Sequence, residues 1–238
     1  MLVLGIDTAT PQVGCAIGGH EGVLASFHAA RGRRHTETLV PAIDFIRRQA
    51  QIELDEISVV AVDVGPGLFT GLRVGVATAK AMAVALRVPA IGISSLDLVA
   101  FPVRRSSRLI ASVLDARRAE VFFAFYRQVP GGAQCVSGQR VGSPEELCAE
   151  VLASGEECLA VGDGARRYRE QLEEVGRVEV AEAGLAYPSA ASLVQLAHAR
   201  ALREEFVHAR ELQPVYLRRA DAEINWETRA RARPPVAP

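Results

Sequence analysis

The chain has 238 residues, with 27 basic and 28 acidic side chains, a formal net charge of −1 and 49% hydrophobic residues. These proportions are typical of globular proteins with one or two domains, and they exclude wholesale disorder, collagen and coiled coil. The balanced charge argues against strong binding of nucleic acid by this chain alone, although a local basic patch stays open. No uninterrupted apolar run reaches about 18 residues, and no basic leader is present. Since the four cysteines are also widely spaced, we expect a cytoplasmic protein with reduced thiols.

The first half of the chain alternates strand and helix patterns. Turn signals at residues 10–11 and 18–22 separate three apolar segments, and the next long segment has apolar residues at helical spacing. The predicted elements are strands at 1–9, 12–18 and 23–30, a helix at 35–51, a strand at 57–64, a helix at 70–86 and a strand at 89–93.

The second half repeats this order of elements. Ser143, followed by Pro144 and two acidic residues, predicts the start of a helix. The other predicted elements are strands at 108–114, 121–127, 135–141, 158–161 and 177–180 and helices at 164–175 and 188–203. Two βββαβαβ units predict two lobes, 1–102 and 103–217, with a ligand-binding cleft between them. The Arg- and Pro-rich tail at 218–238 is predicted to be disordered.

The segment from Val64 to Gly75 is the most specific in the chain. A Gly-Pro-Gly turn precedes a helix for which Thr70 is the predicted N-cap. A glycine-rich loop before a helix N-terminus is typical of an anion site, but a tight turn before a capped helix explains it equally well, and the spacing is not that of a P-loop. Arg73 opposes the helix dipole, which predicts a carboxylate or phosphate partner; the plainer explanation is an exposed arginine in an arginine-rich chain.

The same helix carries small residues at a regular spacing. Gly71, Gly75 and Ala79 follow one another at intervals of four residues. Since each glycine costs about 1 kcal/mol relative to alanine in a helix, this stripe predicts close approach of another backbone, from a neighbouring helix or from a partner protein.

Two aspartates end corresponding strands of the two halves. Asp7 is followed by Thr8, and Asp115 is followed by Ala116 and Arg117. Such a turn either holds Mg²⁺ and phosphate or caps itself. Two of them across a cleft are the pattern of the actin-like sugar-kinase superfamily, and this analogy gives the fold class: α/β, with two actin-like (ASKHA, ribonuclease H-like) lobes, each βββαβα(β). The weak candidates for a nucleotide site are Asp7, Thr8, Gly65, Gly67 and Asp115.

Several motifs, in order, resemble the TsaB (YeaZ) family over about residues 1–218. They are Gly5-Ile6-Asp7-Thr8, His35-Thr36-Glu37-x-Leu39-x-Pro41, Gly65-Pro66-Gly67-x-Phe69-Thr70-Gly71-Leu72-Arg73-x-Gly75, Asp115-Ala116-Arg117-x-x-Glu120-Val121, Gly162-Asp163-Gly164-Ala165 and Pro214-x-Tyr216-Leu217-Arg218.

The resemblance implies a function in tRNA modification. Such proteins are required for threonylcarbamoylation of the adenosine next to the anticodon in tRNAs that read codons beginning with A. The TsaB-like subunit is regarded as non-catalytic; it binds a catalytic paralogue, TsaD, and a small ATPase, TsaE, joins them. The resemblance therefore implies that this chain requires no cofactor, that ATP or ADP with Mg²⁺ can be present in the complex, and that contact with tRNA is indirect.

A comparison with the paralogue's metal-binding stretch supports a non-catalytic role. Ser95 and Val99 stand where the paralogue has two metal-binding histidines. Valine cannot coordinate a metal and serine is a poor substitute for imidazole, so no metal site is expected. Peptidase activity is rejected because neither HExxH nor GxSxG is present. His35 is expected to cap or pack at its helix start.

A subunit without chemistry must act through its surface, and the two helices of the first half are the predicted interface. The resemblance points to the same helices for binding TsaD and for a homodimer, as mutually exclusive uses. The predicted interface residues are His35, Leu39, Phe69, Thr70, Gly71, Leu72, Arg73, Gly75, Thr78, Ala79 and Met82. A large residue at Gly75 is expected to block association without unfolding the chain.

Two alternatives remain open. One is an ATP-dependent phosphotransferase or carbamoyl-type transferase that uses Asp7 and Asp115. The other is a generic actin-like sensor or dimerisation module, which leaves Arg73 and the ordered motifs unexplained.

Overall fold

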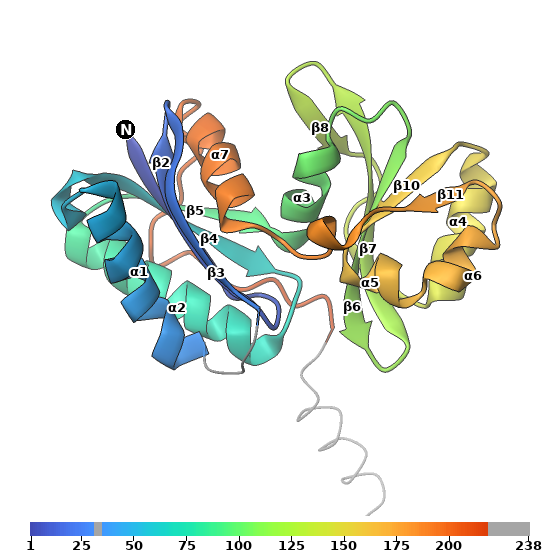
Figure 1. The fold of residues 1–238 in the computed structure, drawn as a ribbon, viewed down its shortest axis with the longest axis horizontal. Coiled ribbons are helices and arrows are strands. Elements are labelled where there is room, and N and C mark those ends of the chain that lie inside the picture. The colour runs from blue at the N-terminus through green and yellow to red at the C-terminus, as the bar shows by residue number, and fades with distance from the viewer. Residues whose placement is uncertain (31–34, 219–238) are drawn as a thin grey trace, which may run out of the picture.

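The computed structural model describes residues 1–30 and 35–218, which form two lobes side by side (Figure 1). The first sheet contains β1 (Leu2–Asp7), β2 (Val13–Gly19), β3 (Gly22–Ala29), β4 (Ile57–Gly65) and β5 (Ala90–Ser94) in the order β3-β2-β1-β4-β5. Strands β1, β2 and β3 are antiparallel neighbours, whereas β1, β4 and β5 run parallel. These strands match the predicted ones to within a few residues.

Helices cover both faces of the first sheet. Helices α1 (His35–Ala50) and α2 (Phe69–Leu86) pack on the face that carries Leu4 and Ile6, and α7 (Ala190–Ala201) packs on the opposite face, against Val3 and Ala16. Sequence reasoning placed the last helix in the second lobe. The structure returns it to the first lobe, because β1, β2, β4 and β5 all direct apolar residues to the face opposite α1 and α2, and α7 covers them. The predicted boundary after residue 102 is therefore wrong for this helix.

The second lobe is built around a sheet in the order β11-β10-β6-β7-β8. Its elements are β6 (Leu109–Arg117), β7 (Glu120–Val129), β8 (Gly132–Cys135), β9 (Arg140–Gly142, paired with β7), α4 (Pro144–Ser154), β10 (Cys158–Val161), α5 (Asp163–Arg167), α6 (Arg169–Glu173) and β11 (Val178–Val180). Helix α4 begins as predicted, since Ser143 and Glu146 form a reciprocal capping box. The single strand predicted at 135–141 is instead two short strands, and the helix predicted at 164–175 is interrupted at Tyr168.

A short helix that the sequence analysis missed lies between the lobes. Helix α3 (Ser95–Ala100), continued by the 3₁₀ turn η2 (Phe101–Val103), packs its Leu96 and Val99 against the second sheet, while Leu98 joins the core beneath α7. Two further 3₁₀ turns, η1 (Leu54–Glu56) and η3 (Ala183–Leu185), complete the fold. The prediction of a two-lobe α/β protein is confirmed. The predicted disordered tail lies outside the described residues, apart from Arg218.

Helix α2 has the composition of a membrane span as well as that of a core helix. It is 18 residues long with a mean hydropathy of 1.3. Its inner face, with Leu72, Val76 and Ala79, is buried against the first sheet. Length and composition alone therefore do not assign it to a membrane.

Candidate functional site

The glycine-rich segment before α2 packs against the turn that follows β1. The Leu68 amide donates a 2.7 Å hydrogen bond to the Ala9 carbonyl, and the Thr8 hydroxyl donates a 2.7 Å bond to the Gly71 carbonyl. A Cβ atom on Gly67 would lie 2.3 Å from the Ala9 oxygen, and one on Gly71 would lie 2.0 Å from the Thr8 oxygen. The glycines are thus required because two backbones of the same chain approach one another here.

The stripe of small residues on α2 consequently faces inward. Gly71, Gly75 and Ala79 are buried, and a Cβ on Gly75 would lie 2.4 Å from the Thr8 hydroxyl oxygen. The predicted use of this stripe by a partner protein is wrong, and so is the expectation that a large residue at Gly75 leaves the fold intact. Thr70 is not the N-cap either: Leu68 occupies that position without a side-chain bond, and Thr70 lies in the first turn.

Other predicted interface residues are also buried. Leu39 and Leu72 belong to the core. His35 is the first residue of α1, and its ring Nε2 lies 3.0 Å from the Thr10 carbonyl oxygen. The expectation that His35 packs at its helix start is thereby confirmed. Five predicted residues remain at least partly accessible on α2: Phe69, Thr70, Arg73, Thr78 and Met82.

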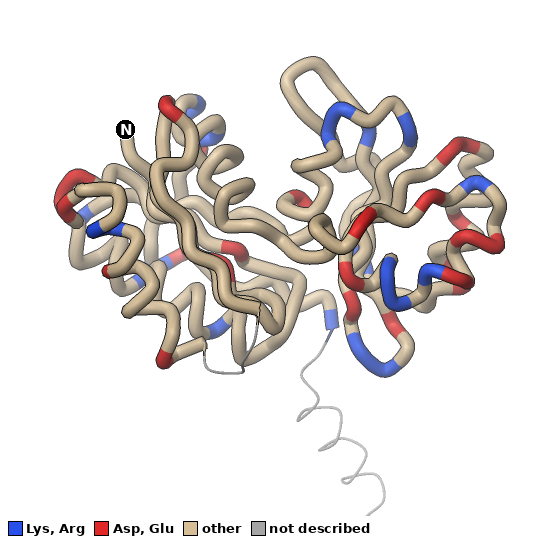
Figure 2. The backbone as a smooth tube through the Cα atoms, in the orientation of Figure 1, with Lys and Arg blue, Asp and Glu red and all other residues tan. Residues whose placement is uncertain are grey.

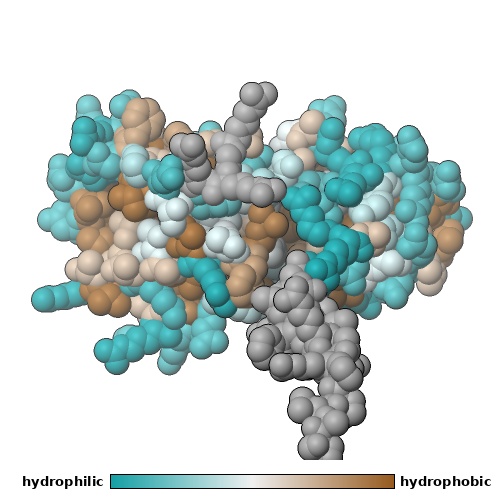
Figure 3. Space-filling view, turned by 90° about the horizontal axis from the view of Figure 1, so that it is seen from below, coloured by the Kyte–Doolittle hydropathy of each residue, from teal (hydrophilic) through white to brown (hydrophobic). Residues whose placement is uncertain are grey.

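The outer face of α2 carries a different set of small residues. Ala77, Ala81 and Ala85 are exposed at intervals of four residues, and Val84 beside them is 61% exposed. The exposed apolar side chains of Val40 (61%) and Phe45 (53%) lie on the neighbouring helix α1. Seen from below, apolar residues gather over this lobe (Figure 3). The outer face of α2, with its small side chains, therefore offers a surface that a second helix can approach closely.

Arg73 lies at one end of this face. Its guanidinium carbon sits 3.7 Å from the centre of the Phe69 ring, and its Nε donates a 3.3 Å bond to the Tyr216 hydroxyl. Tyr216 in turn contacts Phe69, with ring centres 5.1 Å apart. No carboxylate within residues 1–30 and 35–218 forms an ion pair with Arg73, so the predicted anionic partner is not found among them. Aromatic stacking holds the side chain instead.

Two carboxyl groups meet inside the first lobe. Asp7 ends β1 and is 3% exposed, and Asp63 lies in the parallel strand β4 and is 1% exposed. Oδ1 of Asp63 accepts bonds from the Ser95 hydroxyl (2.6 Å) and the Gly65 amide (2.8 Å). Oδ1 of Asp7 accepts a bond from the Ala9 amide at 3.1 Å.

Burial and mutual repulsion favour the protonated form of this carboxyl pair. Burial raises the pKa of Asp7 to about 7, and burial together with the nearby Asp7 raises the pKa of Asp63 well above its usual range. Oδ2 of Asp63 has no partner among the described protein donors. Because two neighbouring buried carboxyl groups are not stable when both are charged, the pair favours holding a proton.

The corresponding aspartate of the second lobe is held by arginines. The side chain of Asp115 is 6% exposed and forms ion pairs with Arg117 (3.2 Å) and Arg167 (3.3 Å). Its backbone amide donates a 2.9 Å bond to Asp163, whose pKa is raised chiefly by burial. Figure 2 shows basic residues gathered at the turn between β6 and β7. Both aspartates named as nucleotide-site candidates therefore already have partners within the chain.

Sequence reasoning missed Asp63 because it lies in the apolar run of a buried strand. The available signal was a single charged residue inside that run, aligned with Asp7 in a parallel neighbour. Ser95 and Val99, which the family resemblance places at the metal-ligand positions of the paralogue, are 0% and 1% exposed. Within the described part of the chain, no cluster of three or more His, Cys, Asp or Glu side chains is placed to hold a metal ion.

Comparison with known proteins agrees with this architecture. A family model described as TsaD, tRNA N6-adenosine threonylcarbamoyltransferase, matches residues 23–226. The chain belongs to that family. It is 29% identical to the tRNA threonylcarbamoyladenosine biosynthesis protein TsaB of Bacillus subtilis strain 168, over 95% of this chain and 98% of that protein.

Two solved structures extend the comparison to the fold. A Pseudomonas aeruginosa protein described as similar to peptidase YEAZ superposes with a TM-score of 0.78 at 25% identity, over 91% of this chain and 99% of that one. A ROK hexokinase from Thermus thermophilus shares the fold with a TM-score of 0.50 at 14% identity, over 86% of this chain and 100% of that one. The predicted TsaB (YeaZ) resemblance and the actin-like fold are thus confirmed.

Proposed function

We propose that this chain is a non-catalytic subunit in the biosynthesis of threonylcarbamoyladenosine in tRNA. The observation that carries the proposal is the likeness to a protein named TsaB over 95% of the chain, within a family named for the threonylcarbamoyltransferase. The proposed partners are a TsaD-like catalytic paralogue and a TsaE-like ATPase, and the proposed location is the cytoplasm. The modified adenosine is the one next to the anticodon in tRNAs that read codons beginning with A.

The state of the two aspartates supports a non-catalytic role. Asp7 is buried beside Asp63 with a raised pKa, and Asp115 pairs with two arginines, so both arrangements disfavour a free carboxylate that positions a metal-bound phosphate. Ser95 and Val99 are enclosed in the core. The proposal requires no cofactor on this chain; ATP or ADP with Mg²⁺ belongs to the assembled complex.

The outer face of α2, with its exposed alanines, supports docking of a helix from the catalytic paralogue. Ala77, Ala81 and Ala85 allow a second helix to approach closely, and Val84 adds apolar area at the same face. A homodimer would use the same face, so self-association and binding of the paralogue exclude one another.

Substitution of Ala81 tests this docking face. Ala81→Leu is expected to weaken binding to the TsaD-like protein of the same organism by at least about tenfold in calorimetry, about 1.4 kcal/mol, because the larger side chain separates the helices. Ala149→Leu is the matched control, since Ala149 is an exposed alanine of α4 in the other lobe. Equal affinity of the two variants would refute the docking face.

Reconstitution tests the biochemical role. Threonylcarbamoylation of tRNA by the TsaD-like and TsaE-like proteins, measured by mass spectrometry of nucleosides, is expected to require this chain. Turnover of ATP by the isolated chain, abolished by Asp7→Asn, would instead establish the phosphotransferase or carbamoyl-type transferase as its function and overturn the proposal.

A further inference from the structure

A groove separates the lobes at the end of the sheets away from Asp7 and Asp115. Its volume is about 860 Å³, and a second hollow of about 470 Å³ adjoins it across the turn between β7 and β8. One wall comes from α7 and the β2–β3 turn, the other from β8, and α3 with η2 forms the floor. These dimensions lie within the range of ligand-binding sites.

The wall formed by β8 has an unpaired backbone edge. Among the strands in residues 1–30 and 35–218, β8 is the last of its sheet and pairs only with β7. In an antiparallel ladder, every second residue of such a strand directs both its N–H and its C=O away from the neighbouring strand. The adjoining Gly131 and Gly132 leave the space beside the backbone open, since a Cβ on either would meet no atom within 4 Å. An extended peptide can therefore add to this edge.

Of the arginines that line the groove, Arg200 and Arg203 pair with acids, whereas Arg104 does not. Asp97, on its floor, is already engaged: it accepts a 2.9 Å bond from the Tyr126 hydroxyl and a 3.2 Å bond from Arg200. Arg104 instead stacks on Phe101, 3.9 Å from the ring centre, and donates to the Phe101 carbonyl. Neither Arg104 nor Arg105 forms an ion pair with any residue in 1–30 or 35–218.

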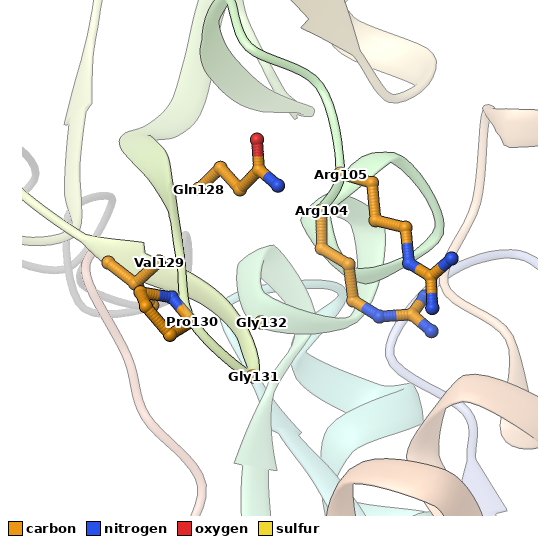
Figure 4. A pocket seen from close by; sticks show the side chains of 7 residues that line it. All are labelled: Arg104, Arg105, Gln128, Val129, Pro130, Gly131 and Gly132. Carbon is orange, nitrogen blue, oxygen red and sulfur yellow. The ribbon is translucent and has the colours of Figure 1, made fainter.

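Figure 4 shows how these arginines are presented to the smaller hollow. The side chains of Arg104 and Arg105 extend in the same direction from one segment, with Gln128 facing them across the hollow and the Pro130–Gly131 turn beside it. Two uncompensated guanidinium groups next to a free strand edge favour carboxylates as ligands.

From this arrangement we propose that the groove binds an extended, acidic peptide segment of another protein, which adds as a strand to β8 and places its carboxylates at Arg104 and Arg105. Apolar side chains of the same segment would lie against Phe101 and Leu196, which line the groove. RNA is the less favoured ligand, because only two cations are unpaired here and a phosphate backbone needs several contacts. The site is separate from the proposed docking face on α2.

Peptide binding tests the inference directly. The probe is a fluorescein-labelled peptide of about eight residues that alternates glutamate and valine, titrated into the full chain at low salt. A control peptide alternates lysine and valine, and the acidic peptide is expected to bind roughly tenfold or more tightly than this control. N-methylation of the valine amides in the acidic peptide is expected to weaken its binding by a similar factor, since methylation removes main-chain hydrogen-bond donors. Amide signals of Ala133 and Cys135 in β8 are expected to shift in NMR spectra.

Arg105→Glu is the protein variant that tests the predicted contact with the carboxylates of the peptide. Arg105 is exposed, so its loss is expected to leave the fold intact. The variant is expected to weaken binding of the acidic peptide by about tenfold, whereas Arg210→Glu, at an exposed arginine outside the groove, leaves binding unchanged. Equal binding of the acidic and basic peptides, shifts confined to α2, or stronger shifts of the β8 amides with a tRNA than with the acidic peptide would each overturn the proposal.

Discussion

Replacing Gly75 with alanine distinguishes a glycine required by internal packing from one kept for a partner. A Cβ at this position would lie 2.4 Å from the Thr8 hydroxyl oxygen, which itself bonds the Gly71 carbonyl at 2.7 Å. Displacing that hydroxyl costs about 1 kcal/mol for the hydrogen bond and about 1–3 kcal/mol for overpacking. Alanine returns about 1 kcal/mol through its higher helix propensity. The expected net loss in the free energy of unfolding is about 1–3 kcal/mol.

A double-mutant cycle identifies the cause of this loss. Thr8→Ala removes the clashing oxygen, so Gly75→Ala is expected to be neutral or to stabilise in that background; the nearest remaining contact of a Cβ at position 75 would be 3.6 Å, to Val62. The expected coupling energy is about 2–4 kcal/mol, the sum of the hydrogen-bond and overpacking costs, measured by urea unfolding of the four proteins. Ala77→Gly, on the outer face, is expected to cost about 1 kcal/mol whether or not Thr8 is present. Stabilisation by Gly75→Ala in the otherwise unchanged protein would refute the reasoning.

Three further predictions concern buried polar groups and thiols. The raised pKa values of Asp7 and Asp63 mean that the folded chain binds more protons than the unfolded one, so the free energy of unfolding is expected to fall as pH rises from about 4 through about 7. Asp63→Asn should reduce this slope by up to about 1.4 kcal/mol per pH unit. An unchanged slope in urea titrations at several pH values would contradict the raised pKa values. Burial raises the thiol pKa of Cys15 and of Cys158 to about 12. A thiol reagent at pH 8 is therefore expected to label only Cys135 and Cys148 until denaturant is added, and rapid labelling of Cys15 in the folded chain would contradict this. Tyr126→Phe is expected to lower the free energy of unfolding by about 1–2 kcal/mol in thermal or urea melts, since Asp97 loses a donor; no change would show that water replaces the hydroxyl.

Local sequence patterns were sufficient to predict most of the elements. Ser143, Pro144 and the acids that follow them specify the start of α4, and the apolar runs specify β1 and β4, because these signals act over a few residues. Helix α3 was missed since its six residues are too short to show a period.

The candidate site was harder to predict because it depends on contacts between distant segments. The spacing of Gly71 and Gly75 indicated close approach of a backbone, but only the structure shows that the approaching segment is Thr8 of the same chain. Likewise, Asp63 becomes important only when the register of β4 brings it beside Asp7. A regular spacing of small residues in the sequence identifies one face of a helix, but it does not indicate whether that face points toward the core or toward solvent.

The position of α7 determines the order in which the chain can complete its lobes. The second sheet uses residues 109–180 without interruption, whereas the first sheet is covered on one of its faces by residues 190–201. As the chain leaves the ribosome, the lobe that begins first must therefore wait for α7, the last helix of the described residues, to be synthesised. Until then Val3, Ala16 and Ile91 stay open to water, so nascent chains that stop before residue 190 are the ones that need a chaperone.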